Sequence, residues 1–456
     1  MCLRQPPCLP WPSFSSAPTD AEIRGTADHR RDGPEVVGLS RRTVRRPEAF
    51  AFDEGRGFRP GSDTEPASGQ TLRRVVRIAA AMALKIVLLA GDGVGPEVMR
   101  EGVKVLKAVE LAYGVSFDLV PFPCGGQHYL ETGEEWPDGA FDSCKAADAI
   151  LLGAVGLPEA VLPNGDVAGV GVVFGLRFGL DLYANVRPTK LYPNVRHKIH
   201  DGFKLVWEPG KVDFVIVREN TEGLYTPTRG FLDRGGVKEL AVDSRVITRK
   251  GAERVIRFAF EISKQRKGAP ADRKHRVTCV DKSNVTAGCK LFRQVYDEVA
   301  ARYPTIQKDY AYIDAFQQWL IRSPEVYDVA VTSNLFGDIA TDLAAVLQGG
   351  MGMAASGNIG DRHAMFEPIH GSAPKHAGKD EVNPIAMILA VQMMLDWLGR
   401  KKGDESMREA ATAIEQAVET TLKKGSVLTY DLGGSAKCSE VGTAIASAVS
   451  RPRKKS

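Results

Sequence analysis

Two aspartates are separated by one helical turn in the segment Ser333–Asp342, which reads SNLFGDIATD. If this segment is helical, Asp338 and Asp342 share a face, where two like charges cost about 0.2–0.5 kcal/mol. A cation between them would offset that cost, and oxygen ligands suit Mg²⁺ or Mn²⁺ better than zinc. Asp314, which ends the run Tyr310–Asp314, is a possible third ligand. The alternative is two solvated aspartates near a helix N-terminus.

Cationic side chains stand at positions from which they could hold an acidic substrate. Arg177 and Arg187 lie ten residues apart, and Arg218 follows the apolar run Val-Ile-Val. Guanidinium groups are the preferred partners of carboxylates, although each arginine alone also fits a surface ion pair. Lys282 follows Val-Thr-Cys-Val-Asp. Beside a divalent cation its pKa would fall and it could act as a base; a salt bridge at a strand end is the alternative.

Two glycine-containing or turn-rich loops could contact a ligand. The loop Gly91-Asp-Gly-Val-Gly-Pro96 lacks the GxGxxG pattern and the later acidic residue of the Rossmann fingerprint. It is either a tight turn in which glycines permit positive φ, or a set of backbone donors beside a ligand. The segment Phe366–Pro384 is polar and precedes a helical pattern, so it either holds an adenine nucleotide or connects two elements.

Short β-rich runs alternate with helical patterns from Met82 onward, with no internal repeat. The runs are Lys85–Ala90, Val115–Val120, Ala149–Gly153, Phe214–Arg218, Arg276–Asp281 and Asp328–Thr332. The helical patterns are Glu97–Val109, Ala252–Lys264, Cys289–Tyr303, Ile339–Leu347, Ile385–Trp397 and Met407–Leu422. Pro96 suits a first helical turn, which needs no backbone donor there. This alternation predicts an α/β fold.

Composition excludes several classes of protein. The 456 residues are 43% hydrophobic and 25% charged, with a formal net charge of +4, so no nucleic-acid surface is indicated. No apolar stretch approaches the length of about 18 residues that a membrane span needs. The seven cysteines form no Cys-x-x-Cys pair, which argues against a disulfide framework or structural zinc. We expect a cytoplasmic enzyme without nucleic-acid or membrane partners.

Residues 1–81 differ from the rest of the chain. They contain many Arg, Pro, Ser and Gly residues, no Lys, and show no sustained periodicity. We expect a disordered extension. Three origins are open: upstream sequence read in frame before a start at Met82, a natural disordered tail, or a targeting segment. The acidic residues argue against the third, because transit peptides are poor in them.

Six segments, in this order, resemble the isocitrate/3-isopropylmalate dehydrogenase family from about Leu84 to about Ala446. They are Gly91–Glu97, Tyr183–Pro188, Val217–Tyr225, Asp281–Asn284, Ser333–Asp342 and Glu367–Pro374. The resemblance implies an α/β fold of two domains that is not of the Rossmann type. One domain would join 82–181 to 349–450, and the second would span 182–348. It also implies a homodimer whose active sites borrow residues across the interface.

The resemblance further implies NAD(P)- and metal-dependent oxidative decarboxylation of a 2-hydroxy acid. Lys282 of the partner subunit would take the hydroxyl proton, and Tyr225 would protonate the enolate after CO₂ leaves. The residues implied for the substrate carboxylates are Arg177, Arg187 and Arg218, and those for Mg²⁺ or Mn²⁺ are Asp338 and Asp342 with Asp314 of the partner subunit. Those implied for the cofactor are Glu367, His370, Gly371, Ser372, Ala373, Lys375, His376, Asn383 and Tyr430.

Departures from the family patterns narrow the choice of cofactor and of substrate. Lys375-His376 stands where NAD-dependent members usually carry an aspartate, and resembles the Lys-Tyr of NADP-dependent isocitrate enzymes. With Tyr430 this favours NADP over NAD, although the arginine expected four residues later is Gly434. Gly171 and Val173 replace the serine and asparagine that read the third carboxylate of isocitrate. We therefore expect an uncharged substituent.

The most favoured substrate is 3-isopropylmalate. Tartrate, D-malate and isocitrate stay open as alternatives, because the short loop before Arg177 also resembles tartrate or D-malate enzymes. A non-catalytic regulatory paralogue is the rival of another class, and it should have lost metal or base residues that are all present here.

Overall fold

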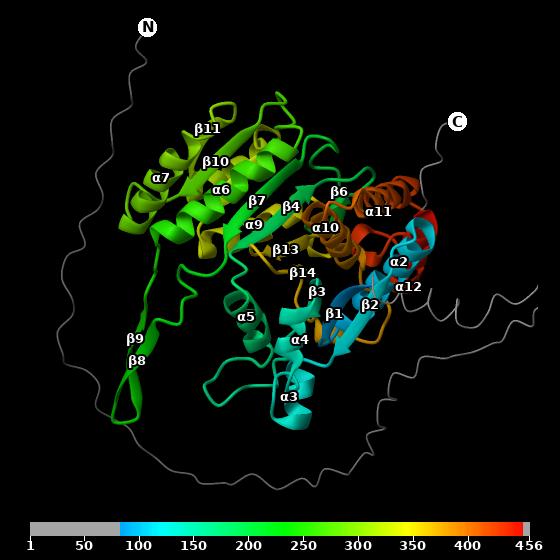
Figure 1. Cartoon of the computed structure of the whole chain (residues 1–456), viewed down its shortest axis with the longest axis horizontal. Helices are drawn as coiled ribbons and strands as arrows, with labels where there is room; N and C mark the ends of the chain where they lie inside the picture. The colour runs from blue at the N-terminus through cyan, green and yellow to red at the C-terminus, as the bar shows by residue number, and fades with distance from the viewer. Residues whose placement is uncertain (1–82, 450–456) are drawn as a thin grey trace, which may run out of the picture. The chain divides into compact units, whose positions relative to one another are not determined.

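The computed structural model describes residues 83–449, so the predicted extension at 1–81 and the start proposed at Met82 lie outside the described residues. Ten strands form one sheet in the order β11-β10-β12-β7-β4-β13-β14-β3-β1-β2 (Figure 1). They are β1 (Leu84–Gly91), β2 (Phe117–Phe122), β3 (Ala149–Ala154), β4 (Ala184–Lys190), β7 (Asp213–Glu219), β10 (Arg276–Asp281), β11 (Gln307–Tyr312), β12 (Val329–Thr332), β13 (Ala355–Ile359) and β14 (Ala364–Pro368). Outside this sheet, two hairpins pair β5 (His197–Ile199) with β6 (Gly202–Lys204), and β8 (Arg229–Arg234) with β9 (Val237–Asp243).

Helices follow most of the strands, which confirms the predicted α/β class. The α-helices are α2 (Gly95–Tyr113), α3 (Gly126–Thr132), α4 (Ala140–Ala146), α5 (Val170–Gly179), α6 (Arg249–Gln265), α7 (Ala287–Ala300), α8 (Ile313–Arg322), α9 (Asn334–Leu347), α10 (Ile385–Lys402), α11 (Glu405–Lys424) and α12 (Cys438–Ala448). Short 3-10 turns are η1 (Pro324–Val326), η2 (Met351–Met353), η3 (Pro374–His376) and η4 (Tyr430–Leu432). Within residues 83–449, no helix has the length and apolar character to cross a membrane.

The sheet has two halves that come from different parts of the sequence. Strands from residues 84–154 and 355–368 form one half, and strands from 184–332 form the other. The halves meet where β4 and β13 pair antiparallel over three residues of each strand. This junction falls where the sequence predicts two domains, and we propose that each half of the sheet belongs to one of them.

Parallel pairing brings three predicted site segments to the same edge of the sheet. β12 runs parallel to β7 and to β10, with Thr332 opposite Arg218. Arg218 therefore lies near the carboxyl end of β7, Lys282 follows β10, and Ser333 follows β12. The carboxyl ends of parallel strands are where α/β sheets bind ligands.

The core lies on both faces of the sheet, because successive side chains of a strand point in opposite directions. Ile86 and Leu88 of β1 pack in the larger buried cluster, which includes residues of α2 and α10. Val87 and Leu89 pack in a second cluster with residues of α4 and α5. This double burial explains why β1 reads as a continuous apolar run.

The loop between β1 and α2 is the tight turn that its glycines predict. Gly91 and Gly93 have φ of 75° and 57°, values that favour glycine. Pro96 lies in the first turn of α2, as expected from its missing N–H. A Cβ on Gly93 would lie 2.0 Å from the carbonyl oxygen of Ser372, so the glycine lets the loop before η3 approach. The turn therefore supports the predicted cofactor loop.

Candidate active site

Arg218 is buried at the end of β7 and is held by helix α9. Its Nε and Nη2 donate to Asn334 Oδ1 at 2.9 and 2.6 Å, and its Nη1 donates to Asp338. A Cβ on Gly337 would lie 2.6 Å from the Arg218 Cβ, so only glycine lets α9 pack this closely. Burial, together with the charge of Arg187, lowers the pKa of Arg218 despite the opposing effect of Asp338. Arg218 is thus a buried cation whose charge its neighbours stabilise only in part.

Arg187 extends from β4 toward the same aspartates. Its Nε donates to Asn185 at 2.8 Å and its Nη1 to Thr341 at 2.5 Å. Its guanidinium nitrogens lie 3.6 Å from an Asp338 oxygen and 3.5 Å from an Asp342 oxygen. Arg187 is 8% exposed, and burial lowers its pKa while Asp338 raises it. Arg187 therefore contacts both aspartates and shares Asp338 with Arg218.

Arg177 completes the cationic group from α5, near the C-terminal end of that helix. Its Nη2 donates to Glu367 at 3.0 Å, whereas its buried Nε has no hydrogen-bond partner among the described residues. Its charge acts on Arg187, Arg218 and Asp338. The structure therefore brings together the three arginines that the sequence singled out. Glu367, which is predicted to bind the cofactor, accepts hydrogen bonds from Arg177 and Asn358.

Asp338 and Asp342 lie one turn apart on α9, as the spacing predicted. Burial alone would raise the pKa of Asp338, but Arg218, the Tyr225 hydroxyl and Arg187 outweigh it and lower the pKa. Burial and the charge of Asp338 raise the pKa of Asp342, against the effect of Arg187. Arg187 and Arg218 therefore offset the repulsion between the two aspartates, for which a metal ion was proposed from the sequence. No three His, Cys, Asp or Glu side chains within residues 83–449 are grouped as a metal site.

Tyr225 follows β7 by six residues and donates its hydroxyl proton to Asp338 Oδ2 at 2.7 Å. Its ring lies 5.6 Å from the Arg218 guanidinium and 6.2 Å from the Phe174 ring, which meets it edge-on. Burial and the hydrogen bond to Asp338 raise the pKa of Tyr225 to about 12. The hydroxyl therefore keeps its proton at neutral pH and can donate it.

Lys282 and Asp314 form a separate pair. Lys282 Nζ lies 2.6 Å from Asp314 Oδ1, and the two side chains are 29% and 63% exposed. The hydrogen bond from Lys282 lowers the pKa of Asp314. Neither side chain hydrogen-bonds or ion-pairs with the arginine group in residues 83–449. One chain therefore holds the predicted base and third metal ligand outside the arginine–aspartate cluster.

The predicted cofactor loop is anchored to the β1–α2 turn. The backbone N–H of Val94 donates to the Ser372 carbonyl at 2.8 Å, and Ala373 has φ of 39°. The His376 ring stacks on the Tyr430 ring at 5.7 Å, and its Nδ1 lies 2.8 Å from Glu381. These contacts bring two of the predicted cofactor residues side by side.

Other predicted cofactor residues lie close in sequence to the two stacked residues or contact their neighbours. Asn383 Nδ2 donates to Asp431 at 3.0 Å, next to Tyr430 in sequence. Lys375 and Gly371 are exposed. The Nε2 of His370 is buried without a hydrogen-bond partner in the described structure, and burial lowers the pKa of this histidine. The loop thus offers one orphaned polar nitrogen and one exposed cation.

Helix α5 carries Arg177 and also the residues that are predicted to lie beside the substituent of the substrate. A Cβ on Gly171 would lie 2.0 Å from Glu135 Oε2, so this glycine packs against Glu135, whose carboxylate would have to move to admit a larger residue. The Phe174 ring stacks on Phe178 at 5.7 Å and faces Tyr225. Phe174, three residues before Arg177 on α5, therefore lies beside Tyr225.

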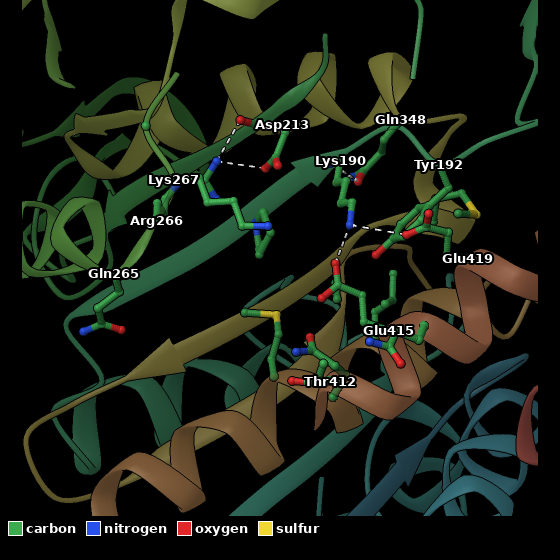
Figure 2. Close-up of a pocket in the computed structure, with 18 residues that line it drawn as sticks. Lys190, Tyr192, Asp213, Gln265, Arg266, Lys267, Gln348, Thr412, Glu415 and Glu419 are labelled. Carbon is green, nitrogen blue, oxygen red and sulfur yellow. Dashed lines mark hydrogen bonds and ion pairs between the residues drawn. The ribbon is translucent and has the colours of Figure 1, made fainter. Parts of the chain in front are cut away.

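A cavity of about 510 Å³ lies away from this site (Figure 2). It is lined by Pro188 and Lys190 of β4, which alternate with Arg187 and so face away from the arginine group. Lys190 pairs there with Glu415 at 2.6 Å.

Several functional residues were missed from the sequence. Asn334 orients Arg218, and Asn185 and Thr341 orient Arg187. Asn334 and Thr341 lie within the Ser333–Asp342 motif. Their amide and hydroxyl groups marked them as possible hydrogen-bonding residues, but the sequence did not show which side chains they contact. Asn185 lies in the Tyr183–Pro188 motif, two residues before Arg187, which places both on one face of a strand.

The chain is similar to known proteins over most of its length. A family described as isocitrate/isopropylmalate dehydrogenase matches residues 85–445. The 3-isopropylmalate dehydrogenase of Thermobifida fusca is 41% identical and covers 81% of this chain and 99% of that protein. A 3-isopropylmalate/3-methylmalate dehydrogenase of Methanocaldococcus jannaschii is 40% identical over 80% of this chain and 98% of its own. The solved isocitrate dehydrogenase of Methylococcus capsulatus is 36% identical, with a TM-score of 0.69 over 80% of this chain and 99% of its own.

Proposed function

This chain belongs to the isocitrate/isopropylmalate dehydrogenase family, and we propose that it oxidatively decarboxylates 3-isopropylmalate with a divalent metal and NADP. Members of this kind are β-decarboxylating dehydrogenases, and the solved β-decarboxylating dehydrogenase of Thermococcus kodakarensis is 36% identical with a TM-score of 0.63. The observation that carries the proposal is the convergence of Arg187 and Arg218 on Asp338, with Arg177 close enough to act on all three.

The three arginines suit a substrate with two carboxylates. Arg187 and Arg218 are buried. A buried guanidinium is stabilised by a carboxylate whose two oxygens accept its hydrogen bonds in a fork-like geometry. Arg177 keeps a buried Nε without a partner. A dicarboxylate would supply acceptors for these groups, so we assign the arginines to substrate binding and orientation.

The donor set on α9 fits a hard divalent cation. Asp338 has a lowered pKa and so stays ionised, and Asp342 presents a second carboxylate on the same helix face. Oxygen-only ligands suit Mg²⁺ or Mn²⁺, and Asp314 of the partner subunit would complete the set. Such an ion would stabilise negative charge at the substrate hydroxyl and at the adjacent carboxylate.

The loop before η3 fits the adenosine part of a dinucleotide. His376 and Tyr430 form a stacked aromatic surface, and His370 holds a buried nitrogen without a partner. Lys375 is exposed beside them and would attract a 2′-phosphate, which is why we favour NADP over NAD. The nicotinamide would supply the hydride acceptor.

Proton transfer is assigned to two side chains. The neutral amine of Lys282 of the partner subunit would take the proton of the substrate hydroxyl as hydride leaves the carbon that bears this hydroxyl. Loss of CO₂ from the resulting β-keto acid leaves an enolate. The Tyr225 hydroxyl, which retains its proton because its pKa is about 12, would protonate the enolate carbon.

A homodimer would bring Lys282 and Asp314 to the cluster of the second subunit. The β8–β9 hairpin extends away from the ten-stranded sheet (Figure 1), and all its strand residues are exposed, including Phe231 and Val237, each at 66%. Large exposed apolar side chains on one hairpin favour an interface between protein chains. Trp319 of α8 and Ile339 of α9 are exposed apolar residues as well.

The substituent on the substrate is proposed from α5. Phe174 presents an aromatic ring beside Tyr225, and neither Val173 nor Phe174 can pair with a third carboxylate. An aliphatic group such as isopropyl fits this surface, whereas isocitrate would place a charge there. D-malate and tartrate, with a small or hydroxyl substituent, are the second candidates. A silent paralogue is disfavoured because all eight implied metal, acid–base and arginine positions are occupied.

The test is one set of initial-rate assays with Mn²⁺. It compares 3-isopropylmalate, isocitrate, D-malate and tartrate, each with NAD⁺ and with NADP⁺. We expect the highest kcat/KM with 3-isopropylmalate and NADP⁺. A clear preference for isocitrate would contradict the assignment of Val173 and Phe174, and a tenfold or greater preference for NAD⁺ would contradict the role of Lys375. No turnover of any of the four acids would refute the function.

A further inference from the structure

Arg245, just after the β8–β9 hairpin, contacts segments that lead to three different site residues. Its Nη2 lies 3.0 Å from Ser333 Oγ and 3.2 Å from Cys289 Sγ, and its Nη1 lies 3.3 Å from Thr286 Oγ1. Its guanidinium also lies 4.6 Å from the centre of the Phe336 ring. One side chain therefore joins the start of α7 to the start of α9.

The two hydroxyls that accept from Arg245 sit at N-cap positions. Thr286 precedes α7 and Ser333 precedes α9, yet neither side chain caps its own helix. Thr286 also belongs to the turn after Lys282, because its backbone N–H donates to the Lys282 carbonyl at 3.1 Å. Ser333 begins the helix that carries Asp338, and its carbonyl accepts from the Gly337 N–H at 2.9 Å.

The residue after Arg245 fixes the third segment. Val246 and Gly223 exchange two backbone hydrogen bonds, of 2.8 and 3.0 Å. Gly223 lies two residues before Tyr225 and has φ of 91°, and a Cβ there would lie 2.8 Å from the Asn334 Cβ. The segment 245–246 thus touches the chain next to Tyr225, Lys282 and Asp338.

The electrostatics of Arg245 argue against a purely stabilising role. No carboxylate pairs with it among residues 83–449, and its acceptors are neutral oxygens and a sulfur. It also lies at two helix N-termini, where the helix dipoles disfavour a cation. These hydrogen bonds from a cation to neutral acceptors offset less of its desolvation than a pairing carboxylate would. Their geometric effect, which holds two helix starts at a fixed separation, is the larger consequence.

We propose that Arg245 is a positioning residue: it holds the turn after Lys282, the start of α9 and the Tyr225 loop in the mutual arrangement that catalysis needs. The inference rests on the proposed function, because it assumes that Lys282, Asp338 and Tyr225 act in the reaction. In a dimer of the proposed kind, Arg245 would link the Asp338 of one site to the Lys282 that serves the other.

The test compares R245M with R245K and with R249M as a matched control. Arg249 lies four residues away and pairs with exposed Glu298, so its loss leaves the three segments untouched. For R245M we expect kcat to fall about tenfold or more, since small displacements of reacting groups have effects of this size. The KM for NADP⁺ should change less than about twofold, because the cofactor loop is not touched.

A second readout does not depend on turnover. The affinity for Mn²⁺ in the absence of substrate, measured by electron paramagnetic resonance of the free ion, should be about fivefold weaker in R245M. R245K should recover part of kcat and of Mn²⁺ affinity, and R249M should match the wild type. If kcat and Mn²⁺ affinity of R245M both stay within about twofold of the wild type, the proposal is wrong.

The variant S333A separates positioning from loss of folding. It removes one acceptor with little change in volume, and it should lower kcat by a smaller factor than R245M. Because the two residues act through one hydrogen bond, the double variant should be no slower than R245M, whereas multiplicative losses would contradict the proposal. If the wild-type protein turns over no hydroxy acid, the proposed function fails, and the Mn²⁺ readout still decides the role of Arg245.

Discussion

The arginine–aspartate cluster and the Lys282–Asp314 pair use the same chemistry in different surroundings. In the cluster, Arg218 is 1% exposed, shares Asp338 with Arg187, and is oriented by Asn334. In the pair, Asp314 is 63% exposed and its only ion pair in the described structure is with Lys282. The cluster is assembled within one chain, whereas the pair neutralises itself at the surface.

From this difference we propose that the Lys282–Asp314 half of the site is the half that works with a second subunit. Burying the guanidinium groups of Arg187 and Arg218 is costly, so the geometry of the cluster is built into the β4, β7 and α9 packing. An exposed ion pair contributes little to stability and is easily separated. We therefore propose that Lys282 and Asp314 exchange each other for a substrate and a metal when another chain approaches.

The largest expected effect comes from D338N, compared with D314N. Both changes remove a proposed metal ligand, and each should lower kcat/KM by about 10³-fold or more, the size expected from several kcal/mol of lost transition-state stabilisation. Only D338N should also destabilise the fold, by about 2 kcal/mol, because it leaves buried arginines without their anion. Steady-state kinetics and urea unfolding measure the two effects.

The same pair of variants tests the electrostatics. The pKa of Asp338 is lowered in the folded state, so its ionised form contributes stability above the unfolded pKa of about 3.9, and that contribution is lost as the pH falls through the folded value. The difference in Tm between wild type and D338N should thus be full at pH 7 and shrink below about pH 4. A difference independent of pH would show that charge is not the cause.

The next effect is that of Y225F, which removes the proposed proton donor but keeps the ring that packs on Phe174. We expect kcat to fall about 10²-fold, the usual contribution of a general acid. Because the pKa of Tyr225 is about 12, any alkaline limb of the rate between about pH 8 and 10 should keep its midpoint in Y225F. If that limb disappears in the variant, Tyr225 titrates there and its assignment as a protonated donor is wrong.

A smaller effect is expected outside both regions, at Lys375. The change K375A should reduce kcat/KM for NADP⁺ by about tenfold and leave that for NAD⁺ within about twofold, because an exposed cation acts on the 2′-phosphate alone. K379A is the control, since Lys379 is exposed four residues away and lies 3.9 Å from Glu381. An equal loss with both cofactors in K375A would contradict NADP selection by this residue.

Much of the fold is readable from the sequence where one strand is buried on both faces. β10 has the predicted bounds Arg276–Asp281, and β3 and β7 extend their predicted runs by only a residue or so. The centre of the sheet was not predicted. β4 contains Pro188, and β13 contains Gly357 and Asn358, residues that local propensity assigns to turns.

The tertiary contacts explain those failures. Asn185 of β4 donates to Asn358 of β13 at 2.8 Å, so two buried amides satisfy each other across the junction. Likewise α9 begins at Asn334, five residues before the predicted Ile339, because Asn334 and Gly337 are buried against Arg218 rather than facing an apolar core. Residue types in motifs predicted which groups act, whereas their hydrogen-bond partners depend on contacts distant in sequence.

The most direct test of a shared site uses a hybrid dimer. K282M and D338N are co-expressed with different tags, and the doubly tagged dimer is purified beside each parent. If Lys282 serves the cluster of the other subunit, one of the two sites is intact, and the hybrid should show about half the wild-type kcat per dimer while both parents are nearly inactive. A hybrid as inactive as its parents would contradict the account.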